Sequence, residues 1–468
     1  MLFNSLIFTV FLPIVFIGYW IIPQRFRNYF LLIASYYFYF TYNPYFLLLL
    51  IGTSAFDFWC AKQIQNVPDR KKLYLYLSIV SNIGVLAAFK YSAFFFNSGV
   101  QLINNASGSS YSLMESLIIP AGLSFYTLQS LSYTIDVYRG KYKPNDTLYD
   151  FLLYVSFFPH MVAGPIVRYN TLMPQLKAVS YFKNIDWGSL ARLTIWGYFK
   201  KMVIADNLSE VVTQVFNEPQ YYNGFQFLLA GAMFVIQVYC DLSGYSDIAT
   251  GVAKLFNINL SLNWRRPLLS SSLQEFWTRN HISITTWFRD YLYIGLGGNR
   301  VSYTRWMFNI FLVFLISGLW HGANFTFVIW GAMHGTMYLL EIFVKKTFPS
   351  FKAPRMIGWL YLLSFHTLSL IAFRANSTAD LSYMYRHIFS TEFFGHNVFS
   401  LFQSGSQCWM LFFLCLFLFV KEFNEEFALI NRFPLLYKNL KPAFYMILVW
   451  ILFMIGDFNA NTFIYFQF

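Results

Sequence analysis

Charged side chains are scarce in this sequence. Asp, Glu, Lys and Arg make up 12% of its 468 residues, whereas a soluble domain has roughly 25%. Hydrophobic residues make up 57% of the chain and aromatic residues alone 22%. This composition excludes a soluble globular protein of this length. It predicts a polytopic membrane protein, whose length suits roughly ten to a dozen spans of about 20 residues each.

Cysteine is also sparse. The four cysteines form neither a CxxC pair nor a cluster with histidine, and all lie in apolar surroundings; they are Cys60, Cys240, Cys408 and Cys415. Grouped, regularly spaced cysteines are the usual sign of a disulfide framework or a metal site. We therefore expect buried free thiols and no metal ligands.

The first apolar run lacks the features of a signal peptide. It begins at Met1, with no basic segment before it and no small-residue cleavage site after it, so we expect a retained helix. The chain shows no internal repeat and no boundary to a soluble domain, which predicts one membrane-embedded domain over residues 1–468. Several apolar runs are short or interrupted by Pro, which predicts re-entrant or interfacial segments.

The net charge of +12 does not indicate a nucleic-acid partner, because Lys and Arg occupy short loops between apolar runs. Segments 62–72 and 139–147 are basic, while 97–112 carries no charge. The positive-inside rule places the basic loops in the cytoplasm and 97–112 outside. Segments 344–355 and 421–441 are basic or mixed and are also expected in the cytoplasm. This arrangement puts both termini outside.

One histidine stands inside an apolar run, at His321 in Phe-Leu-Ile-Ser-Gly-Leu-Trp-His-Gly-Ala. An ionisable residue at membrane depth marks a reaction centre or transport path by default. Residues 318–322 and 331–335 share the frame Gly-x-x-His-Gly, in which the glycines allow close helix packing and the histidine could bridge two helices. His321 and His334 are 13 residues apart and project to nearly opposite sides of an ideal helix, so we expect no shared site and a packing role for His334. Trp320 and Asn324 make the surroundings of His321 more polar and aromatic.

Residues 274–294 contain neither Pro nor Gly and predict one amphipathic helix. On its wheel Trp277 and His281 share the apolar face, and Arg289 lies on the charged face. Such a helix suits the membrane surface or the wall of a wet cavity. From this helix alone, a core histidine hydrogen-bonded to a neighbour is the better interpretation of His281.

A polar group interrupts the apolar stretch 237–267. Its members are Asp241, Ser243, Tyr245 and Asp247. Gly244 lies among them and predicts a broken helix, which membranes tolerate only inside protein or against a water-filled cavity. Arg265 and Arg266 follow, and they suit either a phosphate-bearing ligand at the cytoplasmic mouth or anchoring to lipid headgroups.

Taken in order, these segments resemble the membrane-bound O-acyltransferase family and, within it, the alginate O-acetyltransferase-like branch. The resemblance covers nearly the whole chain and is clearest at 158–168, 241–247, 275–300, 317–322 and 463–468. It implies an all-α fold of about 11 transmembrane helices with interfacial segments and a central tunnel. It also implies that His321 matches the catalytic histidine of the family and His281 its second signature histidine.

The resemblance implies transfer of an acetyl group from a cytoplasmic thioester to an extracytoplasmic polysaccharide, as in exopolysaccharide or alginate biosynthesis. The donor is expected to be acetyl-CoA or an acyl carrier, with no bound cofactor, in a bacterial inner membrane. His321 would act as general base or transient nucleophile. Substrate or tunnel contacts are expected from Asp241, Ser243, Tyr245, Asp247, Trp277, Arg289, Trp320 and Asn324.

Because the chain contains no Gly-Asp-Ser hydrolase-like segment, we expect a separate exported acyltransferase to complete the transfer. Two alternatives remain open at this stage. One is transfer of D-alanine from a carrier protein to teichoic acid. The other is a transporter of an acyl-bearing molecule that uses the histidines as proton relays.

Overall fold

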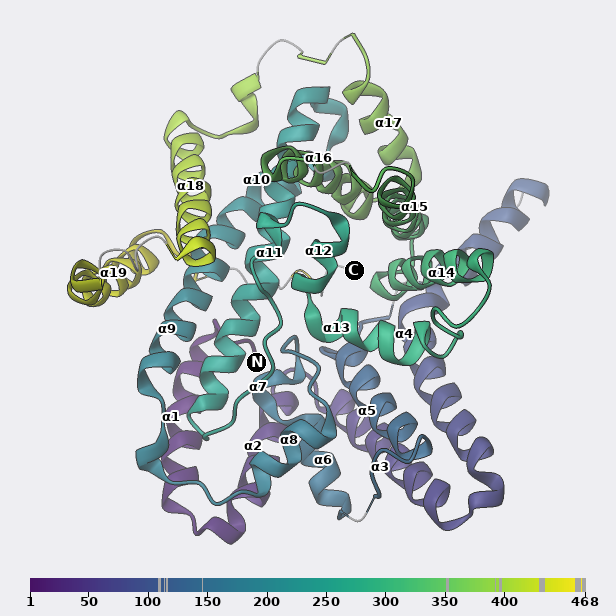
Figure 1. Cartoon of the computed structure of the whole chain (residues 1–468), viewed down its shortest axis with the longest axis vertical. Helices are drawn as coiled ribbons and strands as arrows, with labels where there is room; N and C mark the ends of the chain where they lie inside the picture. The colour runs from purple at the N-terminus through teal and green to yellow at the C-terminus, as the bar shows by residue number, and fades with distance from the viewer. Residues whose placement is uncertain are drawn as a thin grey trace. The chain divides into compact units, whose positions relative to one another are not determined.

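The computed structural model describes residues 1–107, 111–112, 114, 117–144, 146–350, 353–391, 393–394, 398–428, 434–458 and 464. Within these ranges all regular secondary structure is helical and no strand occurs, which confirms the all-α prediction (Figure 1). The chain divides into two compact units. The first comprises Met1–Ala191 and Ala249–Ser261, and the second comprises Arg192–Ile248 and Leu262–Gln467.

The first unit is a helical bundle. Its helices are α1 (Leu6–Ile21), α2 (Arg27–Phe40), α3 (Pro44–Asn66), α4 (Lys71–Ser107), α5 (Leu123–Tyr138), α6 (Leu148–Ser156), α7 (Phe158–Met161) and α8 (Tyr169–Lys177). Helices α3, α4 and α5 pack together. At their centre the buried carboxylate of Asp57 accepts hydrogen bonds from Ser78 (2.6 Å), Asn82 (2.8 Å) and Ser130. A charge inside an apolar bundle is tolerated only when it is hydrogen-bonded in this way.

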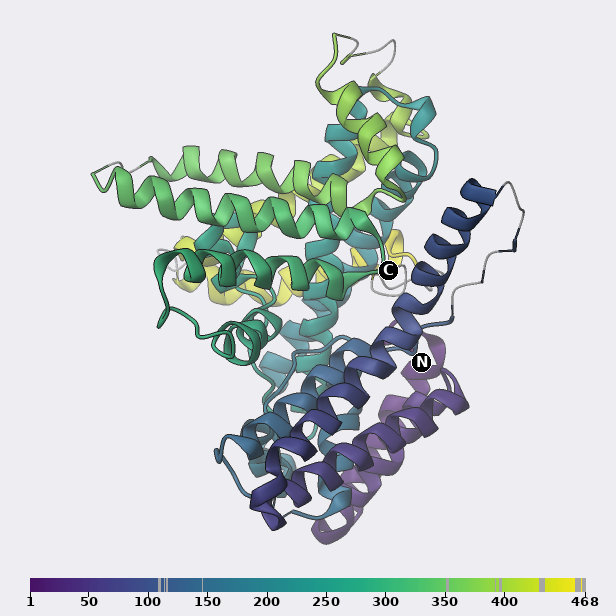
Figure 2. The ribbon, with the colours of Figure 1, turned by 90° about the vertical axis from the view of Figure 1, so that its right-hand side faces the viewer.

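The second unit contains most of the residues that the sequence singles out. Its elements are α9 (Trp187–Tyr198, which begins in the first unit), the π-helical η4 (Phe199–Ala205), α10 (Asp206–Asn217), α11 (Gly224–Lys254, which ends in the first unit), α12 (Leu273–Arg279), α13 (Ile282–Trp287), the π-helical η7 (Phe288–Tyr293), α14 (Tyr303–His321), α15 (Phe325–Thr347), α16 (Arg355–Arg374), α17 (Thr378–Ile388), α18 (Gly405–Phe427) and α19 (Pro434–Ile455). Helices α14, α15 and α16 pack in sequence order, and Figure 2 shows them as stacked green rods.

Seven helices in the described ranges are long and apolar enough to cross a membrane. They are α3, the run Pro68–Asn104 that contains most of α4, α11, α14, α15, α16 and α18. Two shorter apolar helices, Leu6–Ile21 and Leu440–Ile455, accompany them. The expected number of about 11 spans stays a prediction.

Local sequence signals explain where several helices begin. The Asn43 side chain accepts from the backbone of Tyr45 at the start of α3, whose first residue is Pro44. Ser404 caps α18 in the same way. Such caps satisfy backbone N–H groups that have no partner inside the helix.

The predicted helix over 274–294 is wrong. The chain breaks after α12, where Asn280 is extended and His281 has a left-handed backbone with φ +43°. The reason is competition for backbone hydrogen bonds: Arg265 N–H donates to the Arg279 carbonyl, and Ile282 N–H donates to the Asn263 carbonyl, both at 2.9 Å. The sides predicted for two of the residues nevertheless agree with the structure, because His281 is buried and Arg289 is exposed.

The predicted break at Gly244 is also wrong, because α11 runs unbroken from Gly224 to Lys254. Gly244 instead allows a close helix crossing. A Cβ atom there would lie 2.8 Å from the carbonyl oxygen of Gly197, and a Cβ on Gly197 would lie 2.7 Å from that of Gly244. The glycine permits backbone approach rather than unwinding.

Candidate functional site

His321 is the last residue of α14, at the tip of a tight hairpin with α15. The two helices approach closely at the glycines of both Gly-x-x-His-Gly frames. A Cβ on Gly318 would lie 2.3 Å from the Phe327 carbonyl oxygen, and one on Gly331 would lie 2.5 Å from that of Phe314. The prediction that these glycines serve close helix packing is confirmed.

Aromatic rings surround the half-buried His321 side chain. Its ring centroid lies 4.8 Å from Trp320, 5.3 Å from Trp330 and 5.1 Å from Phe373, each ring being steeply inclined to the imidazole. The rings of Trp320, Trp330 and Phe373 thus form an aromatic cage around the His321 imidazole.

His334 belongs to the same cluster, because its ring lies 4.5 Å from Trp330. The expectation that His321 and His334 project to opposite sides is therefore wrong. That projection assumed one continuous helix, whereas the chain reverses between α14 and α15 over residues 322–324. The rings of both histidines consequently lie against the Trp330 ring.

A third histidine, His366 of α16, extends this cluster. Its ring centroid lies 5.5 Å from that of His334 and 3.9 Å from that of Phe276. The His334 Nε2 atom is 3.2 Å from the Ser369 hydroxyl, and His366 Nδ1 is 2.8 Å from the Leu362 carbonyl oxygen. Sequence reasoning missed His366, although it has the same signal as His321, an ionisable residue within an apolar run.

Trp277 of α12 joins this cluster as well. Its ring lies 5.4 Å from His334 and 6.2 Å from Trp330. We call the rings of His321, Trp330, His334, His366, Trp277 and Phe373 the histidine cluster. It brings together α12, α14, α15 and α16, all in the second unit.

His281 lies in a different setting, outside the seven long apolar helices. It is buried, and its ring centroid is 5.1 Å from that of Trp264. Burial lowers the pKa of His281 to about 3, so the imidazole is neutral near pH 7. No described ring contact joins His281 to His321 directly.

The polar residues of α11 are held by two buried lysines of the π-helical segment η4. Lys201 Nζ lies 2.7 Å from an Asp241 oxygen, and Ile464 N–H donates to the other Asp241 oxygen at 2.9 Å.

The second lysine, Lys200, contacts the next polar residues of α11. Its Nζ atom lies 2.8 Å from Asp247. It also donates to Ser243 at 2.8 Å. Tyr245 of the same helix is buried. Sequence reasoning missed these lysines, because the π-helical geometry of Phe199–Ala205 that directs them inward cannot be recognised in an apolar run.

Asn324 and Trp320 have definite positions beside His321. The Asn324 side chain accepts from Thr326 N–H at 3.1 Å and donates to the Asn376 carbonyl at 2.8 Å, so it caps α15. Trp320 is buried, with its ring 6.1 Å from that of Phe288. Arg289, by contrast, is exposed and pairs with Asp290 at 2.9 Å.

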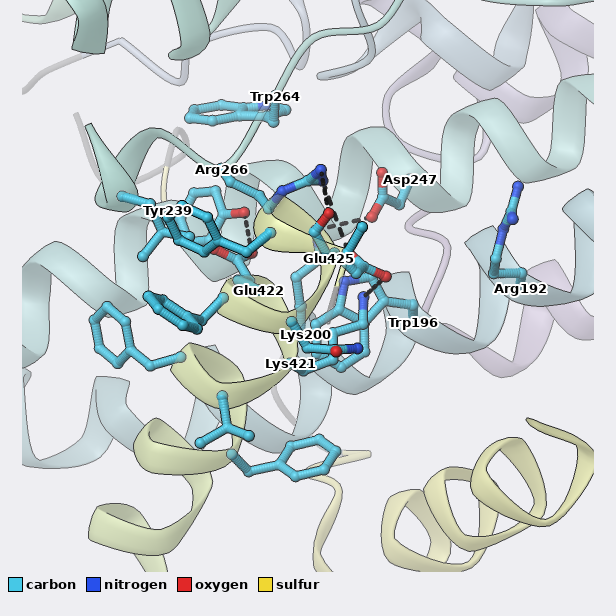
Figure 3. A pocket seen from close by; sticks show the side chains of 18 of the residues that line it. Arg192, Trp196, Lys200, Tyr239, Asp247, Trp264, Arg266, Lys421, Glu422 and Glu425 are labelled. Carbon is cyan, nitrogen blue, oxygen red and sulfur yellow. Dashed lines mark hydrogen bonds and ion pairs between the residues drawn. The ribbon is translucent and has the colours of Figure 1, made fainter. Parts of the chain in front are cut away.

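A cavity of about 1330 Å³ lies elsewhere in the second unit (Figure 3). Asp247, Trp264 and Arg266 line it, but Arg265 does not. The Arg266 Nε atom is 3.1 Å from a Glu426 oxygen. None of the described residues that line this cavity belongs to α14 or α15. The cavity and the histidine cluster are therefore separate features.

Comparison with known proteins gives a consistent result. A profile of the MBOAT, membrane-bound O-acyltransferase family matches residues 146–384. The chain is 38% identical over 398 residues to a probable alginate O-acetylase AlgI of Pseudomonas aeruginosa, which covers 83% of this chain and 75% of the relative. It is 34% identical over 419 residues to a peptidoglycan O-acetyltransferase of Helicobacter pylori, with 81% and 77% coverage. A teichoic acid D-alanyltransferase of Streptococcus thermophilus is 26% identical over 247 residues, with 47% and 56% coverage.

The matched region contains the histidine cluster, the lysine-bound face of α11 and several of the seven long apolar helices. The extent and identity of the AlgI match go well beyond a shared fold. The chain is a multi-pass membrane protein that belongs to the membrane-bound O-acyltransferase family and acts as an O-acyltransferase.

Proposed function

We propose that this protein takes an acetyl group from a cytoplasmic thioester and passes it across a bacterial inner membrane for O-acetylation of an extracytoplasmic polysaccharide. The observation that supports this most directly is the position of His321, at a helix end inside an aromatic cage. Similarity to an alginate O-acetylase and to a peptidoglycan O-acetyltransferase supports the acetyl group and the class of acceptor.

His321 is the proposed reacting residue. As a general base it accepts the proton of an attacking hydroxyl while the oxygen bonds to the thioester carbonyl carbon. The carbon–sulfur bond then breaks, and the thiolate leaves with a proton from the imidazolium. As a nucleophile, the imidazole nitrogen itself attacks the carbonyl and later yields the acyl group to the hydroxyl. Both routes release the free thiol and return His321 to its neutral form.

The surrounding residues have supporting roles in this proposal. Trp320, Trp330 and Phe373 keep water from the thioester, which would otherwise be lost to hydrolysis. His281 is neutral near pH 7 and is proposed to orient the donor or acceptor rather than to carry charge. Asp241 and Asp247 are fixed by lysines, so they are proposed to shape the interior rather than to bind the acceptor.

A donor in the cytoplasm and an acceptor outside require a relay. We propose that a separate exported acyltransferase receives the acetyl group, and that both termini of this chain lie outside. The donor is proposed to be acetyl-CoA or an acyl carrier. Purification of the two proteins together, followed by acetyl transfer that requires both, would support this step; equal transfer by this chain alone would oppose it.

Transfer of D-alanine is the alternative that one observation favours, the 26% identity to a teichoic acid D-alanyltransferase. That match spans 47% of this chain, against 83% for the alginate O-acetylase. Mass spectrometry of the modified polymer separates the two, because an acetyl ester adds about 42 Da per site and a D-alanyl ester about 71 Da, as expected for acyl esters of these two groups. D-alanyl esters without acetyl esters would overturn the proposal.

A further inference from the structure

The cavity of about 1330 Å³ in the second unit is not used by the proposed reaction. We call it the α18 cavity, because α18 forms much of its wall together with parts of α9, α11 and α19. A thioester that reacts at His321 must bring its carbonyl carbon to that imidazole. None of the described lining residues comes from α14 or α15, so the wall of this cavity does not hold the reacting carbonyl group.

Positive charge dominates the lining of the α18 cavity. Six basic side chains face three acidic ones, Asp247, Glu422 and Glu425. The basic ones are Arg192, Lys200, Arg266, Arg355, Lys421 and Lys441. Glu426 and Arg279 do not line the cavity. Glu426 pairs with Arg266 at 3.1 Å and with Arg279 at 2.8 Å, so the excess of positive charge stays at three when both are counted. An excess of this sign selects an anionic ligand.

The inner wall of the cavity is organised by buried polar pairs, several of which Figure 3 shows. Tyr239 donates a hydrogen bond to the buried carboxylate of Glu422. Lys421 Nζ lies 3.6 Å from the centroid of the Trp196 ring and 3.0 Å from a Glu425 oxygen. These contacts hold the ammonium group of Lys421 in a fixed place, so little conformational freedom is lost when a ligand binds there.

The rim of the cavity is apolar and faces outward. Val420 and Phe423 of α18 are 59% and 48% exposed, and Leu440 of α19 is 50% exposed. Helix α18 is long and apolar enough to cross a membrane. In a bilayer these side chains would meet acyl chains, which gives a lipid a route into the cavity from the side.

We propose that the α18 cavity binds an anionic phospholipid, with its phosphate near Lys421 and its acyl chains along Val420 and Phe423. Basic pockets between transmembrane helices on the cytoplasmic side are suited to acidic headgroups. Arg355 lies in segment 344–355, and Lys421 and Lys441 lie in segment 421–441. Both segments are on the cytoplasmic side in the orientation proposed above. The lipid site itself does not depend on the acetyl-transfer proposal.

Native mass spectrometry of the purified full-length protein, with phosphatidylglycerol and phosphatidylethanolamine in equal amounts, tests this site. The test variant combines Arg355→Gln, Lys421→Gln and Lys441→Gln. A matched control combines Arg300→Gln, Arg305→Gln and Lys345→Gln, which removes the same charge from exposed positions outside the cavity. We expect preferential retention of phosphatidylglycerol by the wild type and the control, and a decrease of about tenfold or more in the test variant. Unchanged retention in the test variant would overturn the proposal.

A second measurement uses only the wild-type protein, so its result does not depend on whether the triple variant folds. Phosphatidylglycerol with a photoreactive group in its acyl chain should label peptides that contain residues 417–428 or 440–445. Labelling confined to other peptides would contradict the site. Acetyl-CoA should leave this labelling unchanged, and displacement of the label by acetyl-CoA would assign the cavity to the donor instead.

Discussion

At the residue scale, Trp330 is the side chain that links His321 to His334, with ring centroids 5.3 Å and 4.5 Å away. In the sequence, His321 and His334 have the same Gly-x-x-His-Gly frame and differ only in their positions on an ideal helix and in the Trp320 and Asn324 neighbours of His321. The structure places both against Trp330 because the chain reverses between α14 and α15. Asn324 is a good N-cap residue and lies directly before α15, so a cap signal was present from which the reversal could have been inferred. His366 had no such signal beyond its presence in an apolar run.

The buried neutral state of His281 makes a prediction about acid stability. Its pKa is about 3 in the folded protein against 6.5 for the free side chain. Between these values the unfolded state binds more protons, so the free energy of unfolding falls as the pH falls below 6.5. The loss is about 2 kcal/mol at pH 5. Thermal unfolding in detergent at pH 7.5 and pH 5 should show a smaller acid-induced decrease in Tm for His281→Gln than for the wild type.

The control for this measurement is His387→Gln, a half-buried histidine of α17. It should keep the acid-induced decrease in Tm of the wild type. An equal decrease in the wild type and His281→Gln would show that His281 is not the buried neutral base described here.

At the element scale, the paired-glycine frames predicted correctly where helices pack closely, but the sequence did not predict where helices break or continue. The Gly-x-x-x-Gly frames correctly indicated close packing, which depends on small residues at fixed spacing within one segment. The break at His281 depends on backbone hydrogen bonds with residues 263–265, and no local pattern reports such a distant partner. At Gly244 a break was predicted where the helix is continuous. A glycine at a helix crossing cannot be distinguished by sequence from a glycine at a break.

The close approach of α14 and α15 predicts a large penalty for added volume at Gly318. An added methyl would lie 2.3 Å from the Phe327 carbonyl oxygen, so the helices must separate. Gly318→Ala should lower stability by about 1–3 kcal/mol, measured as a decrease in Tm, and should reduce acetyl transfer because His321 moves with the hairpin. Gly84→Ala in α4, where a Cβ meets nothing within 4 Å, is the control. A Gly318→Ala protein as stable as the Gly84→Ala protein would refute the packing.

The ion pairs between η4 and α11 make a second prediction at this scale. Lys201 is buried and lies 2.7 Å from both Asp206 and Asp241. Lys201→Met leaves two buried carboxylates without their counter-charge and should cost about 3–5 kcal/mol. Denaturant titration followed by tryptophan fluorescence measures this. The exposed Lys345→Met should change stability by less than about 0.5 kcal/mol, and a loss of similar size in both variants would contradict the buried-pair account.

At the scale of the whole molecule, composition and the order of motifs were sufficient for the helical class and the family. Low charge and long apolar runs require a membrane environment, and five motif segments in fixed order identify one family. The C-terminal motif lies mostly outside the described residues; Ile464, which is described, contacts Asp241. The lysines of η4 and the α18 cavity were not predictable, because both arise from contacts between segments distant in sequence.

The central claim is that His321 performs acyl transfer in this protein. The most direct test is transfer of radiolabel from [¹⁴C-acetyl]CoA to a carbohydrate acceptor by the purified protein together with the proposed exported acyltransferase. His321→Ala should lower the initial rate by about 100-fold or more, while His387→Ala should match the wild type and both variants should elute as folded protein. Transfer by His321→Ala at the wild-type rate would contradict the account.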